Sequence, residues 1–393
     1  MASSAAQIRA FSGPPILSYG FRPFFLFGAL WAAIAVALWL PLVSGLITLP
    51  TRFQPVEWHV HELIFGYVPA VIAGFLLTAV PNWTGRLPVV GRPLLVLVGI
   101  WLAGRIAILT SLWIGGRAAA AIDLLFLAAL GFVIAREIVA SNNTKNLKVI
   151  AVIAVLFSGN VAFHVQVLAG VGSGHGMRTG LAAVVMLIML IGGRIIPSFT
   201  RNWLVQHGPE NLPAPFARFD VAAMIVSGAA LALWTAMPSS RLTALFALAA
   251  FAINVMRLAR WLGARTTGEP LVFILHAAYA FVPLGFLLLA LGIVAPAAVQ
   301  PAGALHAWTA GSIGVMTLAV MTRASLGHTG QALTATASIR FIYIAVVVAA
   351  LARVAAAFGV AREPLLYSAA IAWVVAFGTF VVVFAPLLTR RRT

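Results

Sequence analysis

Long, nearly uninterrupted apolar runs constrain the fold of this 393-residue chain more than any other feature of its sequence. Hydrophobic residues make up 62% of the chain and charged residues 8%, whereas soluble domains are about 45–50% apolar and about 25% charged. A helix needs roughly 20 apolar residues to cross a bilayer, so twelve crossings would use about 240 residues and leave only short loops. We therefore predict an all-α, polytopic integral membrane protein that forms a single transmembrane domain over residues 1–393.

The apolar runs are bounded by Pro, Gly, Arg or Asn residues, and these boundaries predict about twelve transmembrane helices. The predicted helices are at residues 24–44, 58–80, 93–113, 117–139, 147–170, 179–200, 218–237, 241–262, 271–295, 303–324, 338–358 and 365–387. The bundle thus covers 24–387, after an N-terminal segment, 1–20, that does not read as a removable signal peptide. The longest loop is predicted at 201–217, near the midpoint, but no motif of the first half recurs in the second.

Positive charge is distributed unequally between the two sides of this predicted bundle. The net charge is +17, and 18 of the 25 basic residues fall in the loops on the side that holds both termini. Positive loops stay in the cytoplasm, so both termini are predicted to be cytoplasmic. The basic residues occur as singles and pairs between apolar runs, which excludes nucleic acid as the expected partner and favours the lipid bilayer.

The chain has no cysteine and eight histidines, most of them inside or at the edge of apolar runs. The absence of cysteine excludes disulfides and every thiolate-bound metal or cluster. Ionisable residues within membrane segments are costly and mark functional sites, and imidazole is the commonest metal ligand. The histidines therefore make metal binding the leading hypothesis, with structural hydrogen bonding as the alternative at each position.

Four histidines are predicted at the outer ends of three helices: His59 and His61 in Trp58–Glu62, His164, and His306. Residues two apart on a helix lie about 200° apart, so His59 and His61 face different flanks and suit two neighbouring centres. Asn160 shares a helix face with His164. His175, in a short outer loop, and His207, in the long inner loop, are expected to be solvated bystanders.

A second pair of histidines, His276 and His328, is predicted at the inner level of the bundle. Arg105 and Asp123 lie at similar depth on adjacent antiparallel helices and are expected to form a structural ion pair, since an unpaired intramembrane charge is costly. Other polar residues near the ends of helices are candidates for binding a cofactor or an anion. They are Arg86, Arg194, Arg201, Arg323, Asn82, Asn160 and Glu62.

Several long motifs resemble those of the NnrS family over residues from about 18 to 385. They are GFRPFF from Gly20, WHVHELIFGY from Trp58, AGFLLTAVPNWTGR from Ala73, FSGNVAFH from Phe157, GGRIIPSFTRNW from Gly192 and MTLAVMTRASLGHTG from Met316. The family's histidine motifs match here at His59, His61, His164, His276, His306 and His328.

The resemblance implies a haem- and copper-containing protein of the bacterial cytoplasmic membrane that acts in denitrification and the nitric oxide response. Haem b and copper are the implied cofactors, nitric oxide or a nitrosyl species is the implied partner, and the electron donor stays open. If the protein is an enzyme, it is an oxidoreductase acting on nitric oxide. Two alternatives remain: a secondary transporter that uses intramembrane His and Arg residues, and a haem-based sensor or assembly factor without turnover.

Overall fold

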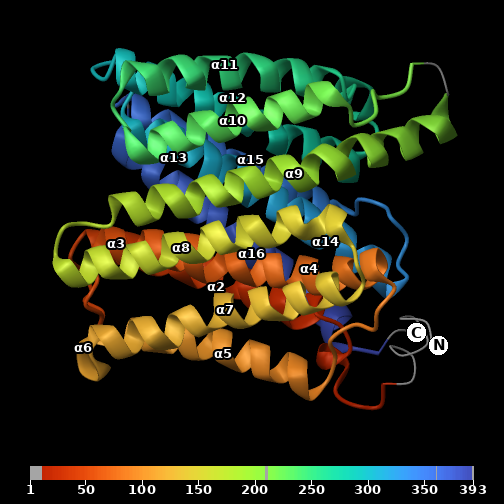
Figure 1. Ribbon diagram of the computed structural model, residues 1–393, viewed down its shortest axis with the longest axis horizontal. Coiled ribbons are helices and arrows are strands. Elements are labelled where there is room, and N and C mark those ends of the chain that lie inside the picture. Colours follow the sequence, from red (N-terminus) through yellow and green to blue (C-terminus); the bar gives the residue numbers. More distant parts are fainter. Residues whose placement is uncertain (1–10, 209–210, 360, 392–393) are drawn as a thin grey trace. The chain divides into compact units, whose positions relative to one another are not determined.

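The computed structural model describes residues 11–208, 211–359 and 361–391, and over these residues it is helical with no β-strand. Within that part of the chain, twelve helices are long and apolar enough to cross a membrane (Figure 1). The predicted all-α polytopic architecture is thereby confirmed, while the side on which the termini lie stays a prediction. Residues 1–10 of the predicted N-terminal segment lie outside the described residues.

The spans follow one another along the chain with short connections. Their elements are α2 (Phe21–Val43), the continuous α3 (Pro55–His61), η2 (Glu62–Tyr67) and α4 (Val68–Thr84), α5 (Arg92–Leu109), α7 (Gly116–Ala140), α8 (Leu147–Ala169), α9 (Gly174–His207), α10 (Arg218–Ala236), α11 (Arg241–Ala259), α12 (Pro270–Val294), the continuous α13 (Pro301–His306), η5 (Ala307–Val315) and α14 (Met316–Thr329), α15 (Ala337–Ala355) and α16 (Arg362–Thr389). Short helices include η1 (Pro15–Leu17), α6 (Ser111–Ile114), η3 (Thr144–Asn146), η4 (Gly263–Thr266) and η6 (Ala356–Phe358).

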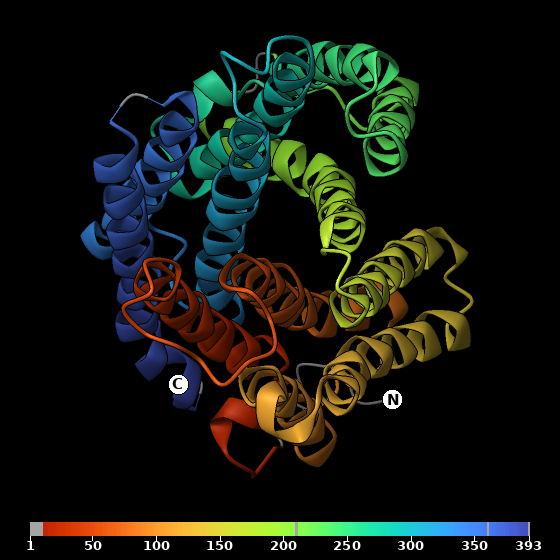
Figure 2. The ribbon, with the colours of Figure 1, turned by 90° about the vertical axis from the view of Figure 1, so that its left-hand side faces the viewer.

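The helices group into two compact units. Of the described residues, the first comprises those within 1–180, 324–331 and 377–393, and the second comprises those within 181–323 and 332–376. In the first unit α7 packs against α4, α5 and α8, and α2 packs against α4. In the second, α11 lies between α10 and α12, and both α12 and α15 contact η5. The green helices α10 and α11 lie side by side in Figure 1 and also in Figure 2, which shows the same ribbon turned by 90°.

Helix α9 is longer than the sequence predicted. It continues through Pro197 to His207 and so takes in the first seven residues of the segment expected as the 201–217 loop. The polar residues of this last part satisfy their own hydrogen bonds: Thr200 Oγ1 donates to the carbonyl of Ile196 (2.9 Å), and His207 Nδ1 donates to the carbonyl of Trp203 (2.9 Å). The polar residues near the end of α9 therefore do not terminate the helix before His207.

Two spans share a local architecture that the search for repeated motifs did not detect. Each begins with a Gln-Pro pair, Gln54-Pro55 or Gln300-Pro301, and a short α-helix that ends at a histidine, His61 or His306. A π-helical segment follows immediately in both, η2 and η5. These spans also bury large shares of their apolar windows, 83% and 78%. π-Helical segments within α-helices are frequent at functional sites, so both histidines lie where a site is expected.

Candidate metal centre

His61 is held at a buried position by the way its span begins. Pro55 occupies the first helical turn, and the Glu57 carboxylate accepts a hydrogen bond from the Gln54 backbone N–H (3.1 Å). These features start α3 one turn before the histidines. The imidazole of His61 is fully buried, and its Nδ1 lies 3.1 Å from Oε1 of Glu62. Because a carboxylate oxygen accepts, Nδ1 carries a proton, and Nε2 is the nitrogen that can act as a metal ligand.

Asp123 and His164 complete a group of three around this imidazole. Nε2 of His164 lies 3.0 Å from Oδ2 of Asp123, and Nε2 of His61 lies 3.3 Å from the same oxygen. Asn160, one turn before His164 on α8, donates through Nδ2 to that oxygen as well (2.8 Å). Helices α3, α7 and α8 thus bring three potential ligands to one point, all of them buried.

Arg105 on α5 balances the negative charge of this group. Its Nη1 donates to both carboxylate oxygens of Glu62 (2.7 and 2.8 Å), and its Nη2 donates to Oδ1 of Asp123. The guanidinium packs against Gly66, where a Cβ atom would overlap it. Arg105 and Asp123 therefore form an ion pair, but Asp123 also faces the two imidazoles, so the pair is part of a larger buried network.

The donor set fits a small metal ion. The ligand atoms of His61, Asp123 and His164 all lie within 4.8 Å of one another, and two ligands of a tetrahedral ion with bonds of about 2.0–2.1 Å stand roughly 3.3 Å apart. Among the described residues, Nε2 of His61 makes no hydrogen bond although it faces a carboxylate oxygen. An imidazole between two carboxylates takes either a second proton or a metal cation at Nε2, and two imidazoles with one carboxylate are ligands of Fe, Cu and Zn.

The other predicted outer histidines are not members of this group. The ring of His59 stacks on Trp39, with centroids 4.3 Å apart, on another flank of the helix from His61. His306 belongs to the second unit, where its Nδ1 donates to the carbonyl of Ala302 (2.8 Å). His175 is exposed at the start of α9, and His207 is exposed and stacks on Trp203.

The two predicted inner histidines have separate surroundings. Nε2 of His276 donates to Oγ1 of Thr200 (2.7 Å) in the second unit. His328 lies in the first unit between the rings of Tyr19 and Phe21, at 5.5 Å from each. Burial raises the pKa of Tyr19 to about 12, so its hydroxyl stays protonated and donates to the carbonyl of Thr78 (3.2 Å).

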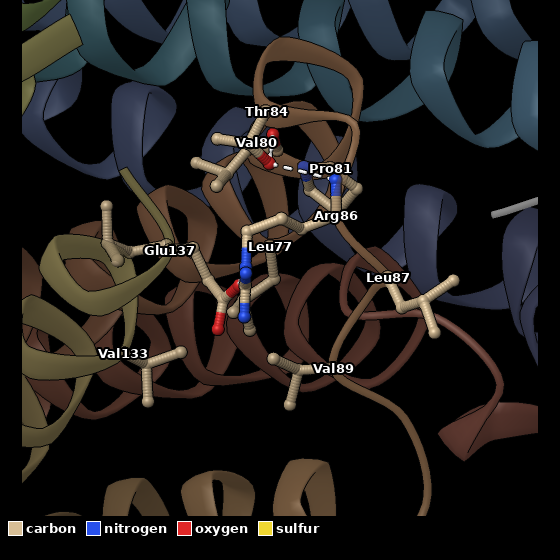
Figure 3. Close-up of a pocket in the computed structure, with 10 residues that line it drawn as sticks. Leu77, Val80, Pro81, Thr84, Arg86, Leu87, Val89, Val133 and Glu137 are labelled. Carbon is tan, nitrogen blue, oxygen red and sulfur yellow. Dashed lines mark hydrogen bonds and ion pairs between the residues drawn. The ribbon is translucent and has the colours of Figure 1, made fainter. Parts of the chain in front are cut away.

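The polar candidates near the helix ends are mostly at the surface. Figure 3 shows Arg86 facing Glu137 across a narrow pocket between α4 and α7, and its Nε donates to that carboxylate. Arg136 donates to the other oxygen of Glu137 (2.7 Å), so the two arginines and this carboxylate together keep one net positive charge.

The other polar candidates Asn82, Arg194 and Arg201 are exposed. The guanidinium of Arg323 lies over the ring of Phe199, 4.1 Å from its centroid. Anion binding by these residues stays a prediction.

The sequence reasoning missed a second buried charge network, which lies in the second unit. Arg257 on α11 is fully buried and donates through Nε to Oδ1 of Asp220 (2.9 Å) and through Nη1 to the hydroxyl of Tyr279 (2.8 Å). That hydroxyl donates to Oδ1 of Asn254 (2.8 Å). Both charged residues lie near helix ends, and Arg257 is one of the 18 basic residues that the charge distribution placed in loops. Asp220 was the available signal, since few acidic residues occur in the chain.

The comparison with protein-family models agrees with the motifs. The family model described as NnrS protein matches residues 15–392, nearly the whole chain. No curated protein matches the sequence. The matched region contains every residue of the metal centre as well as His59, His276, His306 and His328. The chain therefore belongs to the NnrS family of membrane proteins.

Proposed function

We propose that this protein is a membrane metalloprotein of the nitric oxide response and that His61, Asp123 and His164 hold a copper ion. The observation that carries the proposal is the convergence of these three ligand atoms, buried and within 4.8 Å of one another. The NnrS family is linked to the nitric oxide response. We further propose that this multi-pass protein resides in the bacterial cytoplasmic membrane.

The chemistry of the ligands and of nitric oxide together favours copper at this site. Imidazole and carboxylate bind zinc, iron and copper, but zinc has no redox chemistry. A bound copper ion would supply a centre that binds nitric oxide and exchanges one electron with it. Glu62 would fix the orientation and tautomer of His61, as outer-shell carboxylates do for metal-binding histidines. Arg105 would keep both carboxylates ionised in a low-dielectric interior.

A haem would require a different site in this chain. Haem iron brings four ring nitrogens and takes one or two protein ligands, so three ligand atoms meeting at one point suit a bare ion instead. His306 is the residue we propose as an axial ligand of haem b. Its Nδ1 donates to the backbone carbonyl of Ala302, the outer-shell hydrogen bond that is typical of a metal-bound histidine.

The cellular role is tested by complementation of a bacterial strain that lacks its own protein of this family. The wild-type chain is expected to restore growth in the presence of a nitric oxide donor, whereas His61→Ala and His164→Ala are expected not to. His175→Ala, at an exposed position, is the matched control and should protect like wild type. Full protection by His61→Ala at equal membrane abundance would contradict the proposal.

The haem ligand is tested separately by absorption spectroscopy of purified protein. We expect a Soret band that is lost in His306→Ala and retained in His61→Ala, because the two residues serve different metals. A Soret band of full intensity in His306→Ala would remove this residue from the proposal and leave the copper site untouched.

A further inference from the structure

Three phenyl rings surround the imidazoles of the metal centre. The ring of Phe53 lies with its centroid 5.1 Å from that of His61 and 5.9 Å from that of His164. Phe65 and Phe163 lie 5.6 and 5.4 Å from His61. Phe163 also contacts both other phenyl rings, at 5.8 and 5.6 Å. We call Phe53, Phe65 and Phe163 the phenyl cage.

Phe53 is the part of the phenyl cage that lies toward the surface. It belongs to the loop between α2 and α3, where its neighbours Arg52 and Gln54 are exposed and its own ring turns inward and is buried. The loop is fixed in place: the backbone N–H of Arg52 donates to Oγ of Ser111 (2.9 Å), and the carbonyl of Pro50 accepts from Leu112 (3.1 Å). The Phe53 ring therefore separates both imidazoles from the end of the bundle.

The phenyl cage discriminates by desolvation and not by the charge of the site. Glu62 and Asp123 face one guanidinium, that of Arg105, so these three groups carry one net negative charge, which a bound Cu(II) ion reverses. An anion that approaches the site must pass an apolar ring and shed its hydration, which costs far more for a charged molecule than for an apolar one. A small uncharged molecule loses little hydration free energy when it passes the same ring.

We infer that the phenyl cage restricts the metal centre to small uncharged molecules, diatomic gases such as nitric oxide, and that Phe53 is the residue that determines this specificity. The inference rests on the proposed metal site and names the class of ligand that reaches it. The ring of Phe53 slows the entry of nitrogen oxyanions and other small anions. The gas enters when that ring rotates within its packed position.

The test uses the full-length protein loaded with Cu(II), with azide as the anionic probe and nitric oxide as the uncharged one. Azide that binds Cu(II) gives a charge-transfer absorption band, and nitric oxide removes the Cu(II) EPR signal by pairing the two unpaired electrons. Wild type is expected to lose its EPR signal with nitric oxide yet to bind azide slowly. Phe53→Ala is expected to bind azide about tenfold faster or more, which corresponds to roughly 1.4 kcal/mol of barrier.

Matched variants separate the cage from general loosening of the protein. Phe132→Ala removes a phenyl ring that is 67% exposed on α7 and should behave as wild type. Phe53→Leu keeps an apolar side chain for the case in which the alanine variant loses copper, and it too should bind azide faster than wild type. Azide binding to wild type as fast as to Phe53→Ala would overturn the inference while leaving the copper site intact. Wild type that takes up no copper would instead overturn the proposed function, and the inference with it.

Discussion

Nε2 of His61 lies 3.3 Å from Oδ2 of Asp123, on the opposite side of the imidazole from the contact between Nδ1 and Glu62. One carboxylate thus holds the proton on Nδ1, and the other faces Nε2. A neutral buried histidine pairs one nitrogen with an acceptor and the other with a donor, whereas both nitrogens of His61 face carboxylate acceptors. It also gives Asp123 and Glu62 different roles.

Asp123→Asn is expected to weaken copper binding by more than the roughly 10–100-fold typical of outer-shell changes, because it alters a ligand directly. The amide retains the shape of the carboxylate but not its charge. Affinity is measured by competition with a chelator of known strength. Asp220→Asn is the matched control, because Asp220 is also buried against an arginine but lies in the second unit. Equal affinities for the two variants would remove Asp123 from the ligand set.

Glu62→Gln is expected to weaken copper binding by about 10–100-fold, the usual cost of losing an outer-shell carboxylate. The amide no longer fixes the proton on Nδ1 of His61 in the same way. Glu57→Gln changes the same residue type one turn earlier, where the side chain only accepts from the Gln54 backbone N–H, and should bind copper like wild type. If both variants bind copper equally well, Glu62 has no role in orienting His61.

Arg257→Met is expected to lower the free energy of unfolding by about 3–5 kcal/mol, because it leaves Asp220 buried without its partner. The double variant Arg257→Met/Asp220→Asn should recover most of this loss, and copper content should not change. Unfolding in detergent is followed by circular dichroism. Arg241→Met, at an exposed position, should stay within about 0.5 kcal/mol of wild type. A single Arg257→Met variant as stable as wild type would show that the buried pair is dispensable.

The predicted topology can be tested by cysteine labelling, since the chain contains no cysteine of its own. With both termini in the cytoplasm, Leu46→Cys and Val171→Cys should react with a membrane-impermeant maleimide in intact cells. Leu87→Cys and Leu333→Cys should react only after lysis. All four positions are exposed in loops of the described chain. The reverse labelling pattern would invert the orientation derived from the positive charges.

The sequence alone predicts the fold well, because membrane spans need only long apolar runs. The twelve predicted helices correspond to the twelve spans, with differences at the ends such as the extension of α9 to His207. Those ends depend on local hydrogen bonds that composition does not encode. The π-helical segments after His61 and His306 could not be predicted from the sequence either, because their residues show no periodic pattern.

The site was predictable only in part. His61, His164 and Asn160 follow from helical spacing and depth, and Asp123 was identified by its depth, but as a partner of Arg105 alone. Its place between His61 and His164 depends on how α3, α7 and α8 pack around one point, and the depth of a residue in the membrane does not determine that packing. Phe53 was not predictable at all, since a phenylalanine in an apolar chain carries no signal until its ring is seen against both imidazoles.

The most direct test of the central claim is the copper content of purified protein, combined with the Cu(II) EPR spectrum. We predict that wild type and His175→Ala hold one copper ion with nitrogen couplings from two imidazoles, and that His61→Ala and His164→Ala each lose it. Folding of every variant is checked by circular dichroism. A well-folded His61→Ala/His164→Ala double variant that retains the copper and its spectrum would contradict the assignment of the site.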